Sequence, residues 1–451
     1  MWQCSNYLMR CSLNLLNRKT NPVISRFCSA APNTYDVAIV GGGIIGLATG
    51  RELLTRFPKL RMIVLEKEAT LAFHQSGHNS GVIHAGIYYA PGSLKAKLCV
   101  EGMKLAYEYL DKRKIPYKRC GKLIVAVEAE QLPRLDDLMQ RAKLNNVAGV
   151  QMIPEHEIAS IEPHCKGLRA IHSSNTGIVD WQKVAIAFGE DFVSLGGNIK
   201  TNFEITGITE ARENCDFPLL LEGKRVDHGS TTSAYIQCRH LITCAGLQSD
   251  RLAQMSKCPV DPKIVPFRGD FLKLRPEACH LVRGNIYPVP DPRFPFLGVH
   301  FTPRIDGSVW LGPNAVLALK REGYGLIDFD LKDAWDSLTY PGFHRIAFKY
   351  LGVGLDEMVR AFIMSRQIKQ LQRYIPELKL SDVERGPSGV RAQALDRQGR
   401  LVDDFVIHTG TGSVAERVMH VRNAPSPAAT SSLAIARLLC DKVKEQFRLQ
   451  G

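Results

Sequence analysis

Three glycines at fixed spacing carry the clearest chemical signal in the sequence of 451 residues. Gly41, Gly43 and Gly46 follow a short apolar, β-branched run at residues 36–40 and match the pattern G-x-G-x-x-G. In this pattern the first glycine permits a tight turn and the second lets the backbone approach a pyrophosphate, while the third lets a helix pack against the strand. These residues therefore predict a turn that binds the phosphates of a dinucleotide.

The elements expected around this turn support the same prediction. A helix over residues 45–56 would direct the free N–H groups of its first turn, including that of Ile45, at the phosphates. A second strand over residues 61–65 ends at Glu66, where an acidic residue accepts hydrogen bonds from an adenosine ribose. A strand–helix turn without a ligand is the alternative, and the pattern by itself does not distinguish NAD from FAD.

A polar loop at residues 67–89 follows the second strand and favours FAD. A simple nicotinamide enzyme would continue directly into its next strand and helix, whereas this loop is rich in Gly, Ser, His and Asn. Its string HNSGVIHAGIYY resembles the FAD-dependent oxidoreductases of the D-amino-acid oxidase and glycerol-3-phosphate dehydrogenase group, in which such a loop passes beside the flavin ring. The resemblance implies that Asn79, Ser80 and Gly81 contact the cofactor and that His84 lies beside the flavin.

Longer strings narrow the resemblance to one family within this group. The sequence from Tyr35 to the C-terminal helix is similar to the mitochondrial FAD-dependent L-2-hydroxyglutarate dehydrogenases, most specifically in HNSGVIHAGIYY, VPFRGD and RGPSGVRAQALDR. This resemblance implies oxidation of L-2-hydroxyglutarate to 2-oxoglutarate by hydride transfer to FAD. We expect the FAD to be bound non-covalently; a covalent bond to a histidine of the string HNSGVIHAGIYY is the alternative. It also implies that the electrons pass to a respiratory-chain acceptor, either a quinone or an electron-transfer flavoprotein. An amino acid or glycerol 3-phosphate as the substrate is the alternative on the same fold.

The oxidation of a 2-hydroxy acid requires a base for the hydroxyl proton and cations for the carboxylates. His84 is the candidate base, because histidine titrates near neutral pH; a role in orienting the flavin is the alternative. Arg391 matches the position at which amino-acid-oxidase relatives bind the α-carboxylate of the substrate. Arg268 and His300 come from strands of the expected substrate domain, and Tyr89 could donate to a carboxylate. Ordinary ion pairs, polar residues on a strand face and packing are the alternatives for these four residues.

Further cofactor contacts are expected outside the first loop, from the resemblance at residues 205 and 245–246 and from a helix N-terminus at residues 425–429, where the sequence departs from the wider group. A strand ending at residues 245–246 closes on glycine, and the last helix would begin near Ser426, with its N-terminus facing the pyrimidine oxygens of the flavin. The further cofactor residues implied are Lys67, Ile205, Ala245, Gly246, Pro425, Ser426, Ala428 and Ala429. No metal site is expected, because the twelve cysteines include no C-x-x-C pair and are expected to be free thiols.

The hydrophobic pattern predicts an α/β fold, with a Rossmann-like FAD-binding domain and a substrate domain built on an antiparallel sheet. The FAD-binding domain is expected to be discontinuous, at residues 34–119, 172–262 and 383–451, with the substrate domain at residues 120–171 and 263–382. Helices are predicted at residues 94–112, 131–146, 181–194 and 431–448, and strand structure at residues 198–208. From residue 383 onward the glycine-rich sequence predicts loops near the cofactor.

The charge distribution indicates a cellular address rather than binding to nucleic acid. The net charge is +13, from 58 basic and 45 acidic residues, but the cations are spread along the chain and form no recognisable nucleic-acid-binding module. Residues 1–30 contain arginine and serine but no acid, which is typical of a mitochondrial transit peptide; a disordered basic tail is the alternative. We expect the protein in the matrix or on the matrix face of the inner membrane, where residues 343–362 form either an interfacial helix or an ordinary surface helix.

Overall fold

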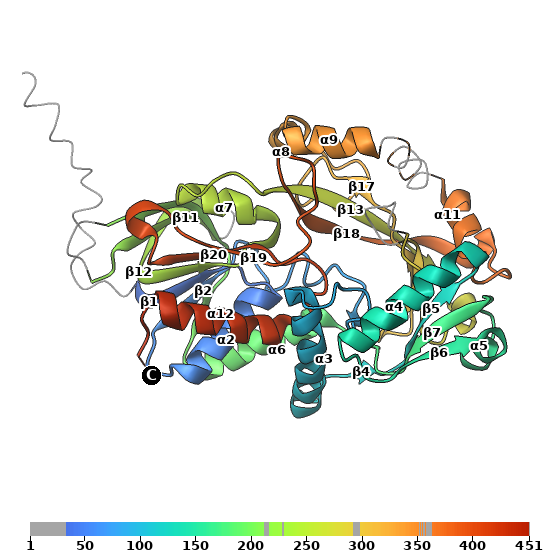
Figure 1. Cartoon of the computed structure of the whole chain (residues 1–451). Coiled ribbons are helices and arrows are strands. Elements are labelled where there is room, and N and C mark those ends of the chain that lie inside the picture. Colours follow the sequence, from blue (N-terminus) through green and yellow to red (C-terminus); the bar gives the residue numbers. More distant parts are fainter. Residues whose placement is uncertain are drawn as a thin grey trace, which may run out of the picture.

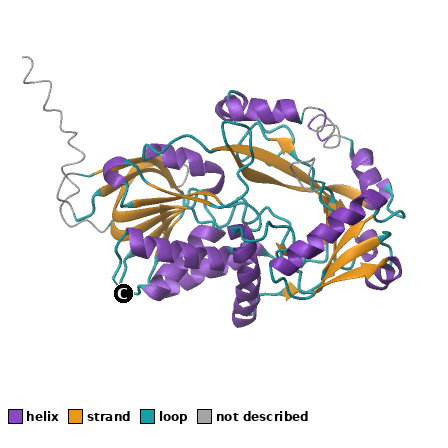
Figure 2. Ribbon diagram, viewed as in Figure 1, coloured by secondary structure: helices purple, strands orange, loops and turns teal. Residues whose placement is uncertain are grey.

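The structure is a computed structural model that describes residues 33–211, 216–227, 230–291, 298–350 and 363–450, together with Gly352, Gly354 and Glu357. Two large sheets dominate it, and loops lie between them (Figures 1 and 2). The predicted transit peptide at residues 1–30 lies outside the described residues, as does most of residues 351–362 in the predicted interfacial segment.

The first sheet is built around the predicted dinucleotide-binding unit. β1 (Thr34–Val40) lies between β2 (Met62–Leu65) and β12 (Ser230–Thr243), and all three run parallel. The strand order is β10–β11–β12–β1–β2–β9, with β20 also paired to β12 and β19 paired to β20. The remaining strands are β9 (Asn198–Lys200), β10 (Phe203–Glu210), β11 (Leu219–Asp227), β19 (Val406–Thr409) and β20 (Val418–Asn423). Parallel central strands with buried side chains confirm the predicted Rossmann-like arrangement.

Helices cover one face of this sheet (Figure 1). α2 (Ile44–Arg56) packs between α6 (Trp181–Ser194) and α12 (Ser432–Gln446), and α3 (Leu94–Arg113) packs against α12. α7 (Ser249–Met255) lies on the opposite face, directly after the 3₁₀ turn η3 (Gly246–Gln248). The predicted helices at residues 94–112, 181–194 and 431–448 are therefore confirmed to within a few residues at each end.

The second sheet has the order β17–β13–β16–β15–β14–β5–β7–β6, and β18 also pairs with β13. Its strand pairs are antiparallel except for that of β5 with β14. The strands are β5 (Lys122–Ala126), β6 (Val150–Pro154), β7 (Arg169–Ser173), β13 (Lys263–Leu274), β14 (Asn285–Pro288), β15 (His300–Pro303), β16 (Val309–Gly312), β17 (Val316–Leu317) and β18 (Val383–Leu395). The prediction of an antiparallel sheet is confirmed apart from the one parallel pair.

Shorter elements complete the described chain. A small third sheet has the order β3–β8–β4. Its strands are β3 (Val82–Ile83), β8 (Gly177–Val179) and β4 (Tyr117–Lys118). The helices around the second sheet are α4 (Leu132–Leu144), α5 (Glu155–Ile161), α8 (Leu331–Leu338), α9 (Pro341–Lys349) and α11 (Met364–Leu371). The other 3₁₀ turns are η2 (Ala129–Gln131), η4 (Pro276–Leu281), η5 (Leu380–Asp382) and η6 (Gly412–Val414).

Two predicted segments differ from the structure. Residues 198–208 form two strands instead of one, because Asn202 has a left-handed backbone with φ of 54° and separates β9 from β10. Residues 383–395 form the long strand β18 rather than a cofactor loop, and β18 pairs with β13 over almost its whole length. This part of the predicted FAD-binding segment therefore lies in the second sheet; the rest of the domain division stays a prediction.

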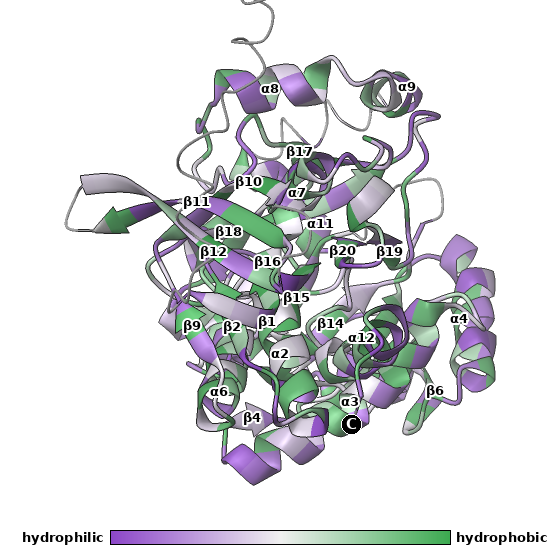
Figure 3. Ribbon diagram, turned by 90° about the vertical axis from the view of Figure 1, so that its left-hand side faces the viewer, coloured by the Kyte–Doolittle hydropathy of each residue, from purple (hydrophilic) through white to green (hydrophobic). Residues whose placement is uncertain are grey.

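The two sheets share buried apolar contacts. The largest cluster of buried side chains includes Ile39 and Leu47 of the dinucleotide-binding unit and also Ile124 and Tyr287 of the second sheet. Figure 3 shows apolar residues on the inner strands, whereas α4 carries hydrophilic residues on its outer side. The eight cysteines in the described ranges are free, as predicted for them. No helix within the described ranges is both long and apolar enough to cross a membrane.

Candidate active site

The glycine-rich turn brings the ends of β1 and β12 unusually close together. Gly41 has φ of +113°, and a Cβ atom there would lie 2.3 Å from the carbonyl oxygen of Cys244. A Cβ atom at Gly46 would lie 2.1 Å from the carbonyl oxygen of Gly41. Any larger residue at either position would therefore displace the backbone of the turn or of α2.

Gly43 differs from the other two glycines because it faces open space. Within 4 Å, a Cβ atom there would meet only the Ser76 hydroxyl, at 3.3 Å. That hydroxyl accepts a hydrogen bond from the N–H of Ile44 at 2.9 Å, and the first turn of α2 contains no acidic residue. The positive end of the helix is thus not neutralised by a carboxylate of its own, and the turn fits the phosphates of a dinucleotide.

Glu66 is buried at the end of β2, where the sequence predicts a contact with the ribose. Its Oε2 accepts a hydrogen bond from the N–H of Gly42, and its Oε1 accepts one from the N–H of Glu68, each at 2.8 Å. Each carboxylate oxygen has two lone pairs, so both can accept a further hydrogen bond from a hydroxyl group. Together with the open position at Gly43, this acceptor makes the site fit FAD.

The polar loop after β2 is folded by Asn79. Its side-chain amide donates hydrogen bonds to the carbonyl oxygens of Gln75 and Ser76 at 3.1 and 2.7 Å, and its Oδ1 accepts one from the N–H of Gly81. The hydroxyl of Ser80 is bonded to the phenol of Tyr287 on β14. Asn79 and Ser80 thus fix the loop against the second sheet, and their predicted contacts with the cofactor stay predictions.

Five side chains from this loop and from strands of the second sheet gather together; we call them the interior cluster. The ring of His300 stacks on that of Tyr287, with 4.1 Å between centroids. The ammonium group of Lys122 lies 4.0 Å from the centre of the Tyr287 ring and 5.4 Å from that of Tyr88. His84 completes the cluster, and its Nδ1 is buried without a hydrogen-bond partner among the described residues. The predicted base and one predicted substrate residue are therefore neighbours.

Burial shifts the protonation of all three basic groups toward the neutral form. Desolvation lowers the pKa of Lys122 to about 7. It also lowers the pKa of His300 to about 3, with smaller contributions from the charges of Lys122 and Arg391. The pKa of His84 falls well below its ordinary value for the same reason, and the charge of Lys122 adds to the shift. Both histidines are therefore neutral at physiological pH.

The two predicted substrate arginines have different surroundings. Arg268 is buried and its guanidinium is paired with the carboxylate of Asp270, with 2.9 Å between Nε and Oδ1. It also donates to the carbonyl oxygen of Gly325. Arg391 lies on β18 with intermediate exposure; desolvation lowers its pKa, and its Nη1 donates to the carbonyl oxygen of Asn314 at 3.4 Å. The structure thus brings Arg391, rather than Arg268, into electrostatic contact with His300 of the interior cluster.

Comparison with known proteins agrees with this site. The family model described as FAD dependent oxidoreductase matches residues 36–442. The mitochondrial L-2-hydroxyglutarate dehydrogenase of Nematostella vectensis is 60% identical over 417 residues, which cover 92% of this chain and 91% of that protein. The human protein of the same name is 52% identical over 438 residues, which cover 96% and 93% of the two chains.

The chain belongs to the L-2-hydroxyglutarate dehydrogenase family. It is an FAD-dependent oxidoreductase, as the sequence predicts, and the geometry of the glycine-rich turn fits that cofactor. The structure is similar to that of an FAD-bound L-alpha-glycerophosphate oxidase from Mycoplasma pneumoniae, with a TM-score of 0.72 and 25% identity over 92% of this chain and 95% of the other. The two-sheet architecture is thus shared with a flavoenzyme of known structure.

Lys122 belongs to the candidate site but was not predicted from the sequence. It begins β5, in which all five residues are buried, and the sequence around it suggests only a hydrophobic strand. One signal was available: a lysine in an otherwise apolar run rarely points into a core without a reason. Recognising it requires knowing which face of the strand is covered, and that depends on the parallel pairing of β5 with β14.

The other predicted cofactor residues lie in three separate places. Ile205 is buried on β10, and Ala245 and Gly246 connect β12 to η3. Pro425, Ser426, Ala428 and Ala429 form turns before α12. The N-cap of α12 is Ser431, so the predicted capping role of Ser426 is wrong: the chain between them forms turns, and the hydroxyl of Ser426 is bonded to the phenol of Tyr89. Cofactor contacts of these residues stay predictions.

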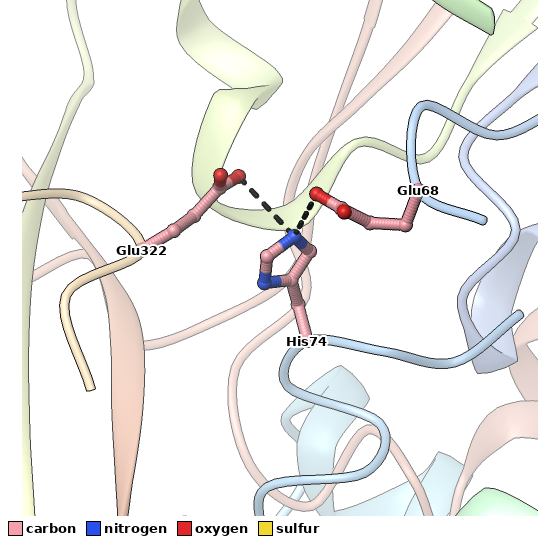
Figure 4. A group of neighbouring side chains, drawn as sticks. All are labelled: Glu68, His74 and Glu322. Atoms are coloured by element: carbon pink, nitrogen blue, oxygen red, sulfur yellow. Dashed lines mark hydrogen bonds and ion pairs between the residues drawn. The ribbon is translucent and has the colours of Figure 1, made fainter. Parts of the chain in front are cut away.

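Lys67 belongs to a second charged group, formed with Glu68, His74 and Glu322 and called the edge cluster here. Figure 4 shows Glu68, His74 and Glu322 of this cluster. The carboxylates of Glu68 and Glu322 both point toward Nε2 of His74. The atoms of these three side chains that could bind a metal ion lie within 4.8 Å of one another. The ammonium of Lys67 contacts all three, at 2.9 Å from both Glu322 and His74. The ammonium group of Lys67 is therefore paired with both carboxylates within the protein.

A cavity of about 400 Å³ lies at the margin of the second sheet, and it is open to solvent. It is lined by the loop residues His78 and Tyr324 and by Asp270, the partner of Arg268, among others. His84, Lys122 and His300 do not line it, so this cavity and the interior cluster are distinct features of the described residues.

Proposed function

We propose that the protein oxidises L-2-hydroxyglutarate to 2-oxoglutarate in an FAD-dependent reaction. The observation that carries the proposal is the position of His84, whose Nδ1 is buried without a partner among the described residues and near Lys122 and His300. A buried nitrogen without a hydrogen-bond partner is costly, and a ligand that donates a proton to it would satisfy it. The hydroxyl group of a 2-hydroxy acid is such a donor.

His84 suits the role of general base. Because its pKa is lowered by burial, the ring is neutral at physiological pH and can accept the hydroxyl proton. Removal of that proton, together with departure of the hydrogen on C2 as a hydride, converts the alcohol into the ketone. FAD supplies the hydride acceptor when it is bound. Burial excludes water from Nδ1 of this base and leaves the atom available to the substrate.

Arg391, His300 and Tyr89 are the proposed contacts of the substrate oxygens. The guanidinium fork of an arginine matches a carboxylate, and Arg391 lies near His300. A neutral His300 can donate one hydrogen bond without adding charge. Arg268 is paired with Asp270, and we propose that it stabilises β13 instead of binding the substrate.

We further propose that the electrons pass to a respiratory-chain acceptor, a quinone or an electron-transfer flavoprotein, in the mitochondrial matrix or at the matrix face of the inner membrane. The mitochondrial names of the relatives and the acid-free sequence of residues 1–30 support the compartment.

Exposed apolar side chains support a peripheral membrane contact: Leu331, Trp335 and Leu338 lie along one side of α8, with 73%, 69% and 44% exposure, and Phe348 of α9 is 87% exposed. Flotation of the protein with vesicles tests this contact. We expect the double variant Trp335→Glu/Phe348→Glu to lose flotation, and a wild-type protein that does not float would contradict the proposed contact.

Turnover with a dye acceptor tests the substrate. Purified holoenzyme is assayed with L-2-hydroxyglutarate, its D-isomer and glycerol 3-phosphate, because a glycerophosphate oxidase shares the fold. We expect turnover of the L-hydroxy acid alone. Preferential turnover of glycerol 3-phosphate, or no activity on L-2-hydroxyglutarate, would keep the fold and discard the proposed function.

A further inference from the structure

The position of Lys122 is unusual for a lysine. It is 3% exposed and begins a strand enclosed by β14 on one side and β7 on the other. Its strand neighbours are Asn285 and Ser173, neither of which carries charge. Transfer of an ammonium group into such a place is costly unless an anion compensates it.

The groups that face this ammonium do not include an anion. They are Cys99 of α3, Cys120 before β5, His84 and Tyr88 of the loop, Tyr287 of β14 and His300 of β15. His172 of β7 is paired with Leu123 and so lies on the other face of β5. Burial keeps the thiol of Cys99 protonated by raising its pKa to about 12. Among the ion pairs of the described residues, none involves Lys122.

We propose that the ammonium group of Lys122 binds a carboxylate of the dicarboxylate substrate. This inference rests on the proposed function, since the substrate of that reaction carries two negative charges. Lys122 is close enough to influence both His84, the proposed base, and His300, which also lies near Arg391. A dianion placed among these groups would supply the missing negative charge. The faces of the Tyr287 and Tyr88 rings stabilise the ammonium in the absence of that anion.

The protonation of Lys122 provides a specific signature. Its pKa of about 7 means that the free enzyme loses this charge as the pH rises above neutrality. Since the carboxylate binds the ammonium form, binding above that pH requires uptake of a proton. The affinity for a dicarboxylate should therefore fall by up to about tenfold per pH unit above pH 7. Arginine at this position would stay charged and remove the dependence.

Glutarate is the probe, because it carries both carboxylates but no hydroxyl to oxidise. Its dissociation constant is measured on FAD-loaded wild-type, Lys122→Met and Lys122→Arg proteins from the change in flavin absorbance, between about pH 6.5 and about pH 9. Lys118→Met, which removes an exposed lysine from the same segment, is the matched control. We expect Lys122→Met to weaken binding at least about tenfold at the acidic end. Lys122→Arg should bind within a few fold of wild type, with no pH dependence, and Lys118→Met should behave as wild type.

Stability and flavin content separate this role from a purely structural one. Methionine is close to lysine in length and removes an unpaired buried charge, so Lys122→Met should bind FAD normally and unfold at the same or a higher temperature. Glutarate binding by Lys122→Met within twofold of wild type would overturn the proposal, as would a change confined to the flavin midpoint potential. The wild-type protein could fail to oxidise L-2-hydroxyglutarate while the Lys122→Met variant still loses glutarate binding. In that case the proposed function fails and the proposed binding site stands.

Discussion

The edge cluster and the interior cluster contain similar side chains but treat charge in opposite ways. In the edge cluster, two carboxylates surround His74 and the ammonium of Lys67. In the interior cluster, Lys122 and His300 face aromatic rings, and no carboxylate acts on His84, Lys122 or His300. Charged groups that are paired with one another within the protein stabilise its fold. Basic groups that are buried without an acidic partner instead indicate where a ligand supplies the missing negative charge.

The pKa shifts of the two clusters express this difference. Burial opposes the charged forms in the edge cluster, yet hydrogen bonds between its members lower the pKa of Glu68 and Glu322 and raise that of Lys67, so all three stay charged at neutral pH. In the interior cluster no carboxylate offsets burial, and the pKa values of His84, Lys122 and His300 all fall. The comparison predicts that substitutions in the interior change turnover and that substitutions of paired charges change stability.

The largest expected effect comes from His84→Asn. Removing a general base typically lowers the rate by about 10²–10⁴-fold, and we expect this loss in the rate of anaerobic flavin reduction by saturating L-2-hydroxyglutarate. The flavin content of the variant should equal that of wild type. Because the pKa of His84 is lowered, the wild-type rate should stay constant from about pH 8 down to about pH 6.5. A variant that retains more than a tenth of the wild-type rate would remove His84 from this role.

A comparable effect, on stability instead of turnover, is expected for Arg321→Met. Arg321 is 1% exposed and is paired with Asp250, which is equally buried. Its two terminal nitrogens, Nη1 and Nη2, donate to the two carboxylate oxygens of Asp250. Removing the arginine leaves a buried carboxylate uncompensated, which costs about 3–5 kcal/mol. Urea denaturation measures the loss, with Arg400→Met as the control, since its pair with Asp396 is solvent-exposed on the arginine side. An unchanged free energy of unfolding would show that buried pairing does not stabilise this fold.

The smallest effect is expected within the edge cluster. Glu322→Gln removes one partner from a group whose side chains are 20–29% exposed, so the loss should be about 0.2–1 kcal/mol at neutral pH. Because the pKa values of Glu68 and Glu322 are lowered, their contribution is present above the ordinary glutamate pKa of about 4.3 and is lost as the pH falls through the lowered values. Denaturation at neutral and acidic pH measures both quantities. Turnover should be unchanged by a chelator; inactivation by one would instead indicate a metal on these residues.

Local patterns were sufficient to predict the dinucleotide-binding unit. β1, α2 and β2 follow one another within about thirty residues, and each shows the periodicity and glycine spacing that its geometry requires. Strand β18 could not be predicted in the same way. It pairs with β13, more than one hundred residues earlier in the chain, and a glycine-rich segment that favours loops locally becomes a strand because that neighbour supplies its hydrogen bonds.

The candidate site shows the same limit. His84 could be proposed from its loop, because the string around it is distinctive. Lys122 acquires its meaning only from the packing of β5 beside β14 and beneath the Tyr287 ring. Likewise, the sequence proposes both Arg268 and Arg391 as substrate residues, and only the structure shows that Arg268 is paired with Asp270 whereas Arg391 lies near His300 of the interior cluster.

Anaerobic titration of the purified holoenzyme with L-2-hydroxyglutarate tests the central claim most directly. The account predicts that the absorbance of oxidised flavin is bleached as one equivalent of 2-oxoglutarate forms per flavin, and that the D-isomer leaves the spectrum unchanged. A flavin that stays oxidised in excess L-2-hydroxyglutarate would contradict the account.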